Sequence, residues 1–191
     1  MTTDDKTEEI KTVSIHVGEY HACRGAAIIE TLLGSCVAVC LIDPVEKIGG
    51  MNHILLPGEA TIGRCDAVSR YAVNAMELLI NKIMALGGDR NRLQAKIFGG
   101  AHVIPSISLE NGVGRKNSNF VLQFLELERI PILSRDLGGK DTRRIYFRSD
   151  TGEVLLKRIP FMKRPPMDIQ EQKLKRIRDK VEKTGDVTIF E

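Results

Sequence analysis

The sequence has no apolar run long enough to cross a membrane. Its longest apolar stretches, such as residues 37–42, have only the length of a strand, whereas a membrane-spanning helix needs roughly 20 apolar residues. Residues 1–11, MTTDDKTEEIK, also lack the basic start and apolar core of a secretory signal. These absences predict a protein without membrane insertion, and we expect it in the cytoplasm.

The sequence also lacks a strong excess of either charge. Its 191 residues include 28 Lys and Arg against 25 Asp and Glu, which leaves a net charge of +3. So small an excess does not favour nucleic acid as a partner. With 42% hydrophobic and 28% charged residues, the composition is that of a globular domain rather than of a disordered or collagen-like chain.

Metal-binding and phosphate-binding spacings are absent as well. The four cysteines form no CxxC pair. On a strand, Cys36 and Cys40 stand about 13 Å apart at about 3.3 Å per residue, which is too far for one metal ion to bind both. The diglycines at 99–100 and 138–139 lack the lysine and the spacing of a phosphate-binding loop. The sequence therefore predicts no metal site and no nucleotide cofactor.

The apolar patterns predict an α/β protein. Residues 37–42 are continuously apolar, which indicates a strand buried on both faces, and residues 48–56 follow as its hairpin partner. Residues 68–86 repeat at helical spacing and end at a diglycine. The other predicted elements are strands at 13–17, 26–29, 95–98, 130–133, 145–148 and 153–159, and a helix capped by Asn117 or Ser118 that continues to Leu127.

The composition changes after residue 160. A basic, proline-rich linker at 163–166 leads into a heavily charged segment with a thin apolar stripe. The sequence thus predicts a polar segment at 1–11, a folded domain at 12–160 and a charged tail at 161–191 that is partly helical or mobile. We expect removal of the tail to leave the fold intact.

The turn at Gly34 and Ser35 places a thiol, Cys36, at the start of the strongest predicted strand. We expect this position to be exposed and rigid, with backbone N–H groups that can point at a developing oxyanion. A free thiol is only a few per cent ionised at neutral pH and needs a partner to become a good nucleophile. No helix begins at Cys36 to lower its pKa, so a histidine is required.

His53 is the best-placed histidine. A turn near residues 44–47 brings its strand alongside the strand that follows Cys36, so that the two residues fall at nearly opposite positions. The glycines at 49–50 leave room for another backbone or a ligand to approach. The alternative, a core thiol and a surface imidazole with no chemical role, stays open on these observations.

The remaining histidines and cysteines are weaker candidates. His102 is separated from Cys36 by the long predicted helix, which favours a structural role, and His16 is predicted to lie at the surface. Cys23 and Cys65 have no basic partner nearby in the sequence. Cys40 lies in the middle of its strand, where burial is expected to raise the pKa of the thiol and make it inert.

A set of motifs in a fixed order resembles the CheD family of chemoreceptor glutamine deamidases. The motifs are TLLGSCVAVCLID at 31–43, GGMNHILLP at 49–57, the segment 70–103, VGRKN at 113–117 and DLGG at 136–139. The resemblance extends from about residue 13 to 159. It implies a layered α/β sandwich of the cysteine-hydrolase type with mixed strands and two main helices, similar to the deamidase domain of cytotoxic necrotizing factor toxins.

The resemblance also implies roles for individual residues. Cys36 matches the nucleophile of the family and His53 matches its base. Thr31 matches a third residue just upstream of the cysteine. The turn at Gly34 and Ser35, which the sequence itself indicates, is the predicted oxyanion site. No cofactor is implied.

The reaction that the resemblance implies is hydrolysis of glutamine side chains to glutamate through a thioester. The same thioester forms from a glutamate methyl ester, so methylesterase activity is a second expectation. The implied substrates are methyl-accepting chemotaxis receptors, modified on their cytoplasmic helical region, and a CheC-type phosphatase is an expected partner. The alternative function is that of an adaptor that binds and regulates such a phosphatase.

Overall fold

The computed structural model describes residues 10–56, 60, 62, 67–103 and 112–160. All of them belong to the first of two units into which the chain divides, residues 1–160. The predictions made for the tail fall on residues 161–191, which lie outside the described residues, as does Cys65.

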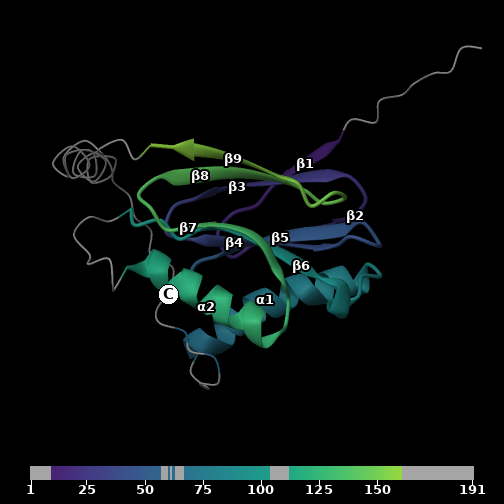
Figure 1. Cartoon of the computed structure of the whole chain (residues 1–191), viewed down its shortest axis with the longest axis horizontal. Helices are drawn as coiled ribbons and strands as arrows, with labels where there is room; N and C mark the ends of the chain where they lie inside the picture. Colours follow the sequence, from purple (N-terminus) through teal and green to yellow (C-terminus); the bar gives the residue numbers. More distant parts are fainter. Residues whose placement is uncertain (1–9, 57–59, 61, 63–66, 104–111, 161–191) are drawn as a thin grey trace, which may run out of the picture. The chain divides into compact units, whose positions relative to one another are not determined.

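Two sheets and two main helices form this unit (Figure 1). The helices are α1 (Ala67–Ala85) and α2 (Val113–Leu127), and a short 3-10 helix, η1, spans Arg90–Arg92. The strands are β1 (Lys11–Ser14), β2 (Tyr20–Arg24), β3 (Ala27–Leu33), β4 (Val37–Asp43), β5 (Ile48–Ile54), β6 (Gln94–Gly99), β7 (Ile132–Leu137), β8 (Thr142–Arg148) and β9 (Val154–Ile159).

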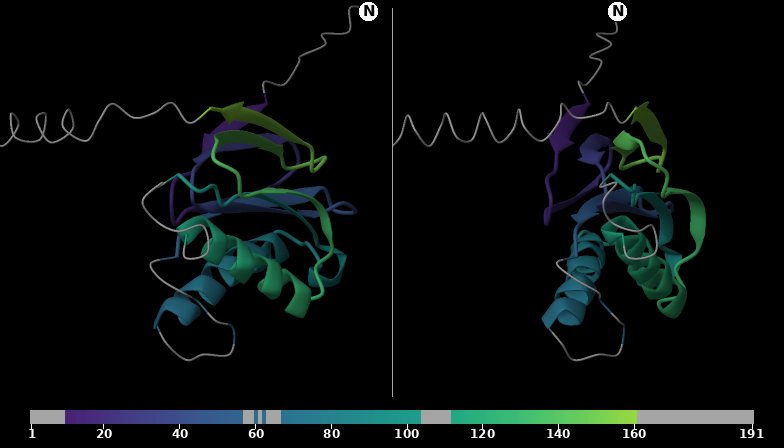
Figure 2. Two further views of the ribbon diagram at one scale, coloured as in Figure 1. Left: turned by 60° about the vertical axis from the view of Figure 1, so that its left-hand side comes forward. Right: turned by 90° about the vertical axis from the view of Figure 1, so that its left-hand side faces the viewer.

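The elements stack in three layers. A five-stranded sheet with the order β2-β5-β4-β6-β7 lies between a four-stranded sheet with the order β1-β3-β8-β9 and the two helices (Figures 1 and 2). The β1–β3 and β6–β7 pairs are parallel and the other pairs are antiparallel. The predicted layered α/β architecture with mixed strands and two main helices is confirmed.

Strand β4 lies at the centre and is buried at every residue. Alternate side chains enter two different cores, because successive residues of a strand point to opposite faces. Val37, Val39 and Leu41 pack in the core that contains the helices. Cys36, Ala38, Cys40 and Ile42 pack in the core between the two sheets. The prediction of a strand buried on both faces is confirmed, and Cys36 lies on the sheet-facing side.

Two glycines of β5 allow the layers to approach closely. A Cβ atom on Gly49 would lie 2.3 Å from the carbonyl oxygen of Ser149, at the end of β8. A Cβ atom on Gly50 would lie 2.7 Å from the Cδ1 atom of Leu79 in α1. The expected close approach at this diglycine is therefore made by a backbone on one side and by a helix on the other.

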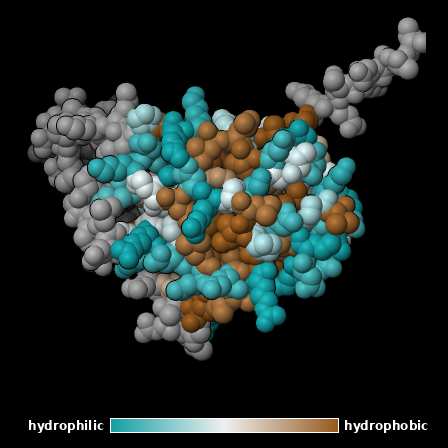
Figure 3. All heavy atoms as spheres, in the orientation of Figure 1, coloured by the Kyte–Doolittle hydropathy of each residue, from teal (hydrophilic) through white to brown (hydrophobic). Residues whose placement is uncertain are grey.

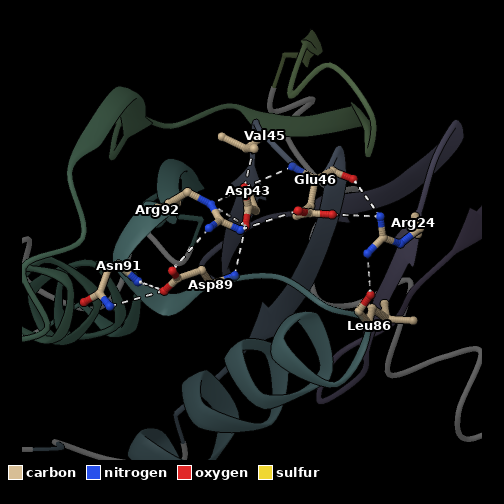
Figure 4. Close-up of polar contacts among 8 residues, drawn as sticks. All are labelled: Arg24, Asp43, Val45, Glu46, Leu86, Asp89, Asn91 and Arg92. Carbon is tan, nitrogen blue, oxygen red and sulfur yellow. Dashed lines mark hydrogen bonds and ion pairs between the residues drawn. The ribbon is translucent and has the colours of Figure 1, made fainter.

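A charged network holds the turn end of the β4–β5 hairpin (Figure 4). The buried Asp43 carboxylate accepts hydrogen bonds from the Arg92 guanidinium at 2.7 Å and from the Asp89 N–H at 2.9 Å. Burial raises the pKa of Asp43, but these hydrogen bonds and those from the N–H groups of the turn outweigh it and hold the pKa at about 2. Arg24 extends the network through an ion pair with Glu46.

Some predicted boundaries are wrong. The sequence patterns do not predict β2, because Ala22 is the only fully buried residue of this edge strand. Helix α2 begins at Val113 with Gly112 as its N-cap, and the predicted caps Asn117 and Ser118 lie buried inside the helix. Smaller shifts, of one to four residues, occur at β1, β3, β6, β7, β8 and β9.

Large apolar side chains at the surface belong to several different elements. The most exposed are Leu155 in β9, Val45 in the hairpin turn and Leu127 at the end of α2. On the face shown in Figure 3, apolar side chains gather along the middle and polar side chains flank them. Such exposure is ordinary for a folded protein. Within the described residues, no helix has the length and hydrophobicity needed to cross a membrane.

Candidate functional site

Cys36 and His53 lie on the same face of the five-stranded sheet. His53 stands opposite Ala38 in the antiparallel β4–β5 register, and Cys36 precedes Ala38 by two residues. The two site residues are thus diagonal neighbours. Such positions are about 7–8 Å apart, which is within reach of a long or aromatic side chain. The predicted hairpin is confirmed, and its register brings the thiol and the imidazole to one face.

Thr31 reaches the same place from the other sheet. Its Oγ1 lies 2.7 Å from Nδ1 of His53 and also 2.7 Å from the carbonyl oxygen of Ile15. A hydroxyl has one hydrogen, and the carbonyl can only accept it, so Thr31 donates to Ile15 and accepts from His53. The proton of the neutral imidazole therefore sits on Nδ1, and Nε2 carries a lone pair.

The Nε2 atom of His53 is a buried polar atom with no hydrogen-bond partner among the described residues. Burial lowers the pKa of His53 to about 4; the nearby His16 acts in the same direction, and the Glu19 carboxylate opposes them. The imidazole is therefore neutral at pH 7. Leaving a buried lone pair unsatisfied is costly, and here the lone pair provides a base on the sheet face that Cys36 shares.

The loop between β1 and β2 fixes the backbone of His53. The N–H of His53 donates to the Glu19 carbonyl at 3.0 Å, and its carbonyl accepts from the Gly18 N–H at 2.8 Å. This loop also carries His16, which the sequence placed at the surface and which is indeed exposed. His16 nevertheless influences His53 through its field, a relation that the sequence patterns do not indicate.

Cys36 is less accessible than the sequence predicts. Its side chain packs in the inter-sheet core with only 9% of its surface exposed, so the expectation of an exposed thiol is wrong. The reason is that the four-stranded sheet covers the face of β4 on which Cys36 lies. Burial raises the pKa of the Cys36 thiol, and a hydrogen bond from its own backbone N–H lowers it in part.

Three consecutive carbonyl groups before β4 are held by hydrogen bonds. The carbonyl of Gly34 accepts from the Ala101 N–H at 2.8 Å, and that of Cys36 accepts from the Gly100 N–H at 2.7 Å. Between them, the Ser35 carbonyl accepts from the Asn117 side chain. A trans peptide holds its N–H opposite its carbonyl, so these bonds also fix the directions of the Ser35 and Cys36 N–H groups.

Glycines make this turn possible. A Cβ atom on Gly99, which has φ +113°, would lie 2.2 Å from the carbonyl oxygen of Cys36. A Cβ atom on Gly114 would lie 2.3 Å from the carbonyl oxygen of Gly100. The end of β6 therefore threads between the Cys36 turn and the start of α2, where any side chain would collide with backbone. The diglycine at 99–100 supports the turn.

Asn117 is a residue whose role sequence reasoning missed. Its Nδ2 donates to the Ser35 carbonyl at 2.8 Å, and its Oδ1 accepts from the Leu56 N–H at 3.1 Å. This fully buried side chain ties the turn before Cys36 to the chain just after β5. The available signal is the VGRKN motif of the family resemblance, which ends at Asn117, whereas the sequence pattern predicts Asn117 only as a helix cap.

The side chains of the other candidates form no hydrogen bond with Cys36 or His53 in the described part of the chain, although His102 lines a small hollow together with Ser35. Cys40 is 1% exposed, and burial strongly raises the pKa of its thiol, as predicted. Cys23 lies 3.3 Å from the Ser149 hydroxyl. His102 follows β6, and its N–H donates to the Gly139 carbonyl. The described residues contain no group of three or more potential ligands that could hold a metal ion.

Comparison with known proteins places the chain in a family. A family model described as "CheD chemotactic sensory transduction" matches residues 55–158. A curated protein of Chromobacterium violaceum, named probable chemoreceptor glutamine deamidase CheD 2, is 45% identical over 97% of this chain and 93% of its own length. The chain belongs to the CheD family.

Other CheD proteins show the same extent of similarity. A probable chemoreceptor glutamine deamidase CheD 1 of Shewanella oneidensis is 43% identical over 97% of this chain and 91% of its own length. A CheD protein of Stenotrophomonas maltophilia with the same activity in its name is 44% identical over 100% of this chain and 98% of its own. The family model begins at Leu55, after the hairpin that carries Cys36 and His53, whereas these CheD relatives align along nearly the whole chain.

Proposed function

We propose that this protein hydrolyses the side-chain amide of glutamine residues on chemoreceptors, which produces glutamate and ammonia. The observation that carries the proposal is the Thr31–His53 hydrogen bond, which leaves a buried lone pair on Nε2 on the face that Cys36 shares. The CheD relatives that span this chain are named chemoreceptor glutamine deamidases, in agreement with an amide hydrolase.

The reaction begins with a neutral pair. Burial holds His53 unprotonated at pH 7 and keeps Cys36 as a thiol. His53 therefore takes the thiol proton as sulfur attacks the amide carbon, so that proton transfer and attack are coupled. Thr31 accepts the Nδ1 hydrogen throughout and keeps Nε2 directed at the reacting atoms.

The reaction also requires hydrogen-bond donors that stabilise the developing oxyanion, and we assign these donors to the turn before β4. As the carbon–sulfur bond forms, negative charge develops on the amide oxygen, and fixed N–H donors stabilise that charge. The N–H of Cys36 is oriented by the hydrogen bond between the Ser35 carbonyl and the Asn117 side chain, and the N–H of Ser35 by the bond between the Gly34 carbonyl and the Ala101 N–H. We assign both as oxyanion donors.

The second half of the reaction reuses His53. The imidazolium gives its proton to the nitrogen, the carbon–nitrogen bond breaks, and ammonia leaves behind a thioester on Cys36. His53 then removes a proton from water, whose oxygen attacks the thioester carbon. The carbon–sulfur bond breaks, and the thiolate recovers a proton. A glutamate methyl ester would reach the same thioester with methanol as the leaving group, so methylesterase activity remains a prediction.

The test uses the full-length protein and a receptor cytoplasmic fragment. Mass spectrometry detects conversion of glutamine to glutamate as an increase of about one mass unit. We expect conversion by the parent protein and none by Cys36→Ala or His53→Ala. Cys40→Ala is the matched control, since it removes a thiol from the same face and should leave conversion intact.

No conversion by the parent protein, together with retained binding to a CheC-type phosphatase, would refute the enzyme and favour the adaptor. Such a partner is a prediction from the resemblance, as is the likeness to the deamidase domain of cytotoxic necrotizing factor toxins. The buried lone pair of His53 favours the enzyme, because an adaptor has no use for it.

A further inference from the structure

A basic cavity of about 790 Å³ opens beside the candidate site. Its lining comes from the first turns of α2, the C-terminal end of β7 and the loop that follows, and Arg158 of β9. Its charged groups are one carboxylate, Asp136, and four cations, Arg115, Arg135, Lys140 and Arg158. We define these four cations and the space between them as the basic cavity.

Most of this positive charge is not neutralised. Asp136 forms ion pairs with the buried Arg143 and with Arg158. Its single negative charge is therefore balanced by these two arginines and does not neutralise the other cations. Arg115, Arg135 and Lys140 have no ion-pair partner in the described part of the chain. All three are exposed, which makes them available to an external anion. The basic cavity is therefore a surface of net positive charge on a protein whose total net charge is only +3.

The sheet places the basic cavity at the same edge as Cys36. Because β6 is antiparallel to β4 and parallel to β7, the ends of β6 and β7 lie beside the start of β4. The strand order β4-β6-β7 separates the start of β4 from Gly138 by two strand spacings, or about 10 Å at about 4.8 Å each. The turn that carries Cys36 and the strand ends that carry the cations thus lie along one edge of the sheet.

A smaller hollow joins the two places. It is lined by Ser35, the residue before Cys36, and it shares His102, Gly112 and Gly114 with the basic cavity. The Gly100 N–H, at the wall of the basic cavity, donates to the Cys36 carbonyl. The surface is therefore continuous from Ser35, the residue before the candidate nucleophile, to the cations.

We propose that the basic cavity binds carboxylate side chains of the substrate protein that flank its target glutamine, and so selects glutamines in acidic surroundings. This inference rests on the proposed function and specifies the substrate. A separation of about 10 Å corresponds to about two turns of a helix at about 5.4 Å per turn. A helical substrate that lies along the sheet edge would therefore present its glutamine to Cys36 and an acidic residue one or two turns away to the cations.

The experiment compares two helical peptides of equal length, each with one central glutamine. In one peptide, glutamates stand one and two turns from this glutamine, and in the other, alanines replace them. Binding to Cys36→Ala protein is measured by fluorescence anisotropy, so that no turnover occurs. We expect the acidic peptide to bind about tenfold more tightly at low salt and to lose this advantage at high salt.

The double variant Arg115→Glu/Arg135→Glu, made in the same Cys36→Ala background, should abolish the preference. A glutamate at position 115 lies in the first turn of α2, where an acidic residue is favourable, so the fold should persist; circular dichroism checks it. Lys82→Glu reverses one charge on α1, outside the lining of the basic cavity, and should retain the preference. Equal binding of the two peptides, or an equal loss in Lys82→Glu, would overturn the inference.

Failure of this inference and failure of the proposed function give different experimental results. Failure of deamidation appears as receptor glutamine left unconverted by the parent protein, whatever the peptides bind. Failure of this inference appears as conversion of both peptides by the parent protein with equal kcat/KM.

Discussion

At its turn end, the β4–β5 hairpin surrounds the buried Asp43 carboxylate with hydrogen-bond donors. At its open end, Nε2 of the buried His53 has no partner in the part of the chain that the structure describes. Both residues are nearly inaccessible to water. The two ends also shift pKa values for different reasons. Burial dominates at His53, whereas hydrogen bonds overcome it at Asp43.

The comparison shows how one hairpin serves stability and chemistry at once. A satisfied buried charge contributes to stability only while its partners remain, and the network at Asp43 fixes the turn end of the hairpin. The unsatisfied end is destabilising by itself, but it is the end where a base is useful. We expect substitutions at one end to change stability and substitutions at the other to change activity.

The largest expected effect is on activity at the open end. Cys36→Ala should reduce deamidation by roughly 10⁴-fold or more, because nucleophile and base act as a unit. Its melting temperature should change by only a few degrees, since one sulfur atom is removed. Conversion of receptor glutamine is followed by mass spectrometry and unfolding by circular dichroism. If Cys36→Ala were unfolded at the assay temperature, the expected separation of activity from stability would be contradicted. Cys40→Ala is the control for the loss of a buried thiol.

At the turn end, Asp43→Asn should lower the free energy of unfolding by about 3 kcal/mol, which is roughly a 100-fold change in the folding equilibrium. The substitution leaves the Arg92 guanidinium without its buried carboxylate. Urea denaturation measures the loss, and the folded variant should keep its kcat. Glu46→Gln, a half-exposed member of the same network, should cost under about 1 kcal/mol. Equal losses in both variants would contradict the role assigned to burial.

Thr31→Val should reduce kcat by about 30- to 100-fold while it keeps the size of the side chain. The imidazole then loses the acceptor that fixes its proton on Nδ1. Thr31→Ser retains the hydroxyl and should restore most of the activity. If valine and serine at this position were equally active, the Thr31–His53 hydrogen bond would have no part in orienting the base.

The pH dependence of stability should separate the two ends into two windows. The pKa of His53 is about 4 in the folded protein against 6.5 for the ordinary residue, so the unfolded chain binds the proton first as pH falls. The resulting loss should reach about 2 kcal/mol by pH ~5. The pKa of Asp43 is about 2 in the folded protein against 3.8 for the ordinary residue. The Asp43 carboxylate therefore stabilises the fold fully above pH 3.8, and this stabilisation is lost as the pH falls toward 2.

Urea denaturation at a series of pH values measures both windows. His53→Gln should remove the slope between about pH 6.5 and 4, and Asp43→Asn should remove the slope below it. An unchanged upper slope in His53→Gln would show that other groups are responsible for it.

The parts of the fold that follow from local pattern could be predicted. The apolar run of β4, its hairpin with β5 and the helical repeat of α1 each leave a clear period in the sequence. Strand β2 leaves none, since it is held at an edge by pairing with β5 and buries a single residue fully. The start of α2 was misplaced because Asn117 has the chemistry of a cap, while its partners are 82 and 61 residues away.

In the candidate site, too, local relations could be predicted from the sequence and contacts between distant segments could not. The relation of Cys36 to His53 follows from one hairpin, so spacing alone is enough to predict it. The contact of Thr31 with His53 crosses between two sheets, and no local pattern reports how sheets stack; only the resemblance to the CheD family indicated this residue. The burial of Cys36 has the same origin, and its exposure was predicted wrongly because the covering sheet is built from distant segments.

The pairing of β3 with β8 has a consequence for the order of folding. Its register joins Ile29 to Phe147 and Thr31 to Ile145, so the sheet that carries Thr31 needs a hairpin from the far end of the domain. Contacts between such distant segments form late, because closing a long loop costs entropy first. During synthesis, Cys36 and His53 leave the ribosome long before β8 does. We therefore expect the nascent chain to remain inactive until its last strands are added.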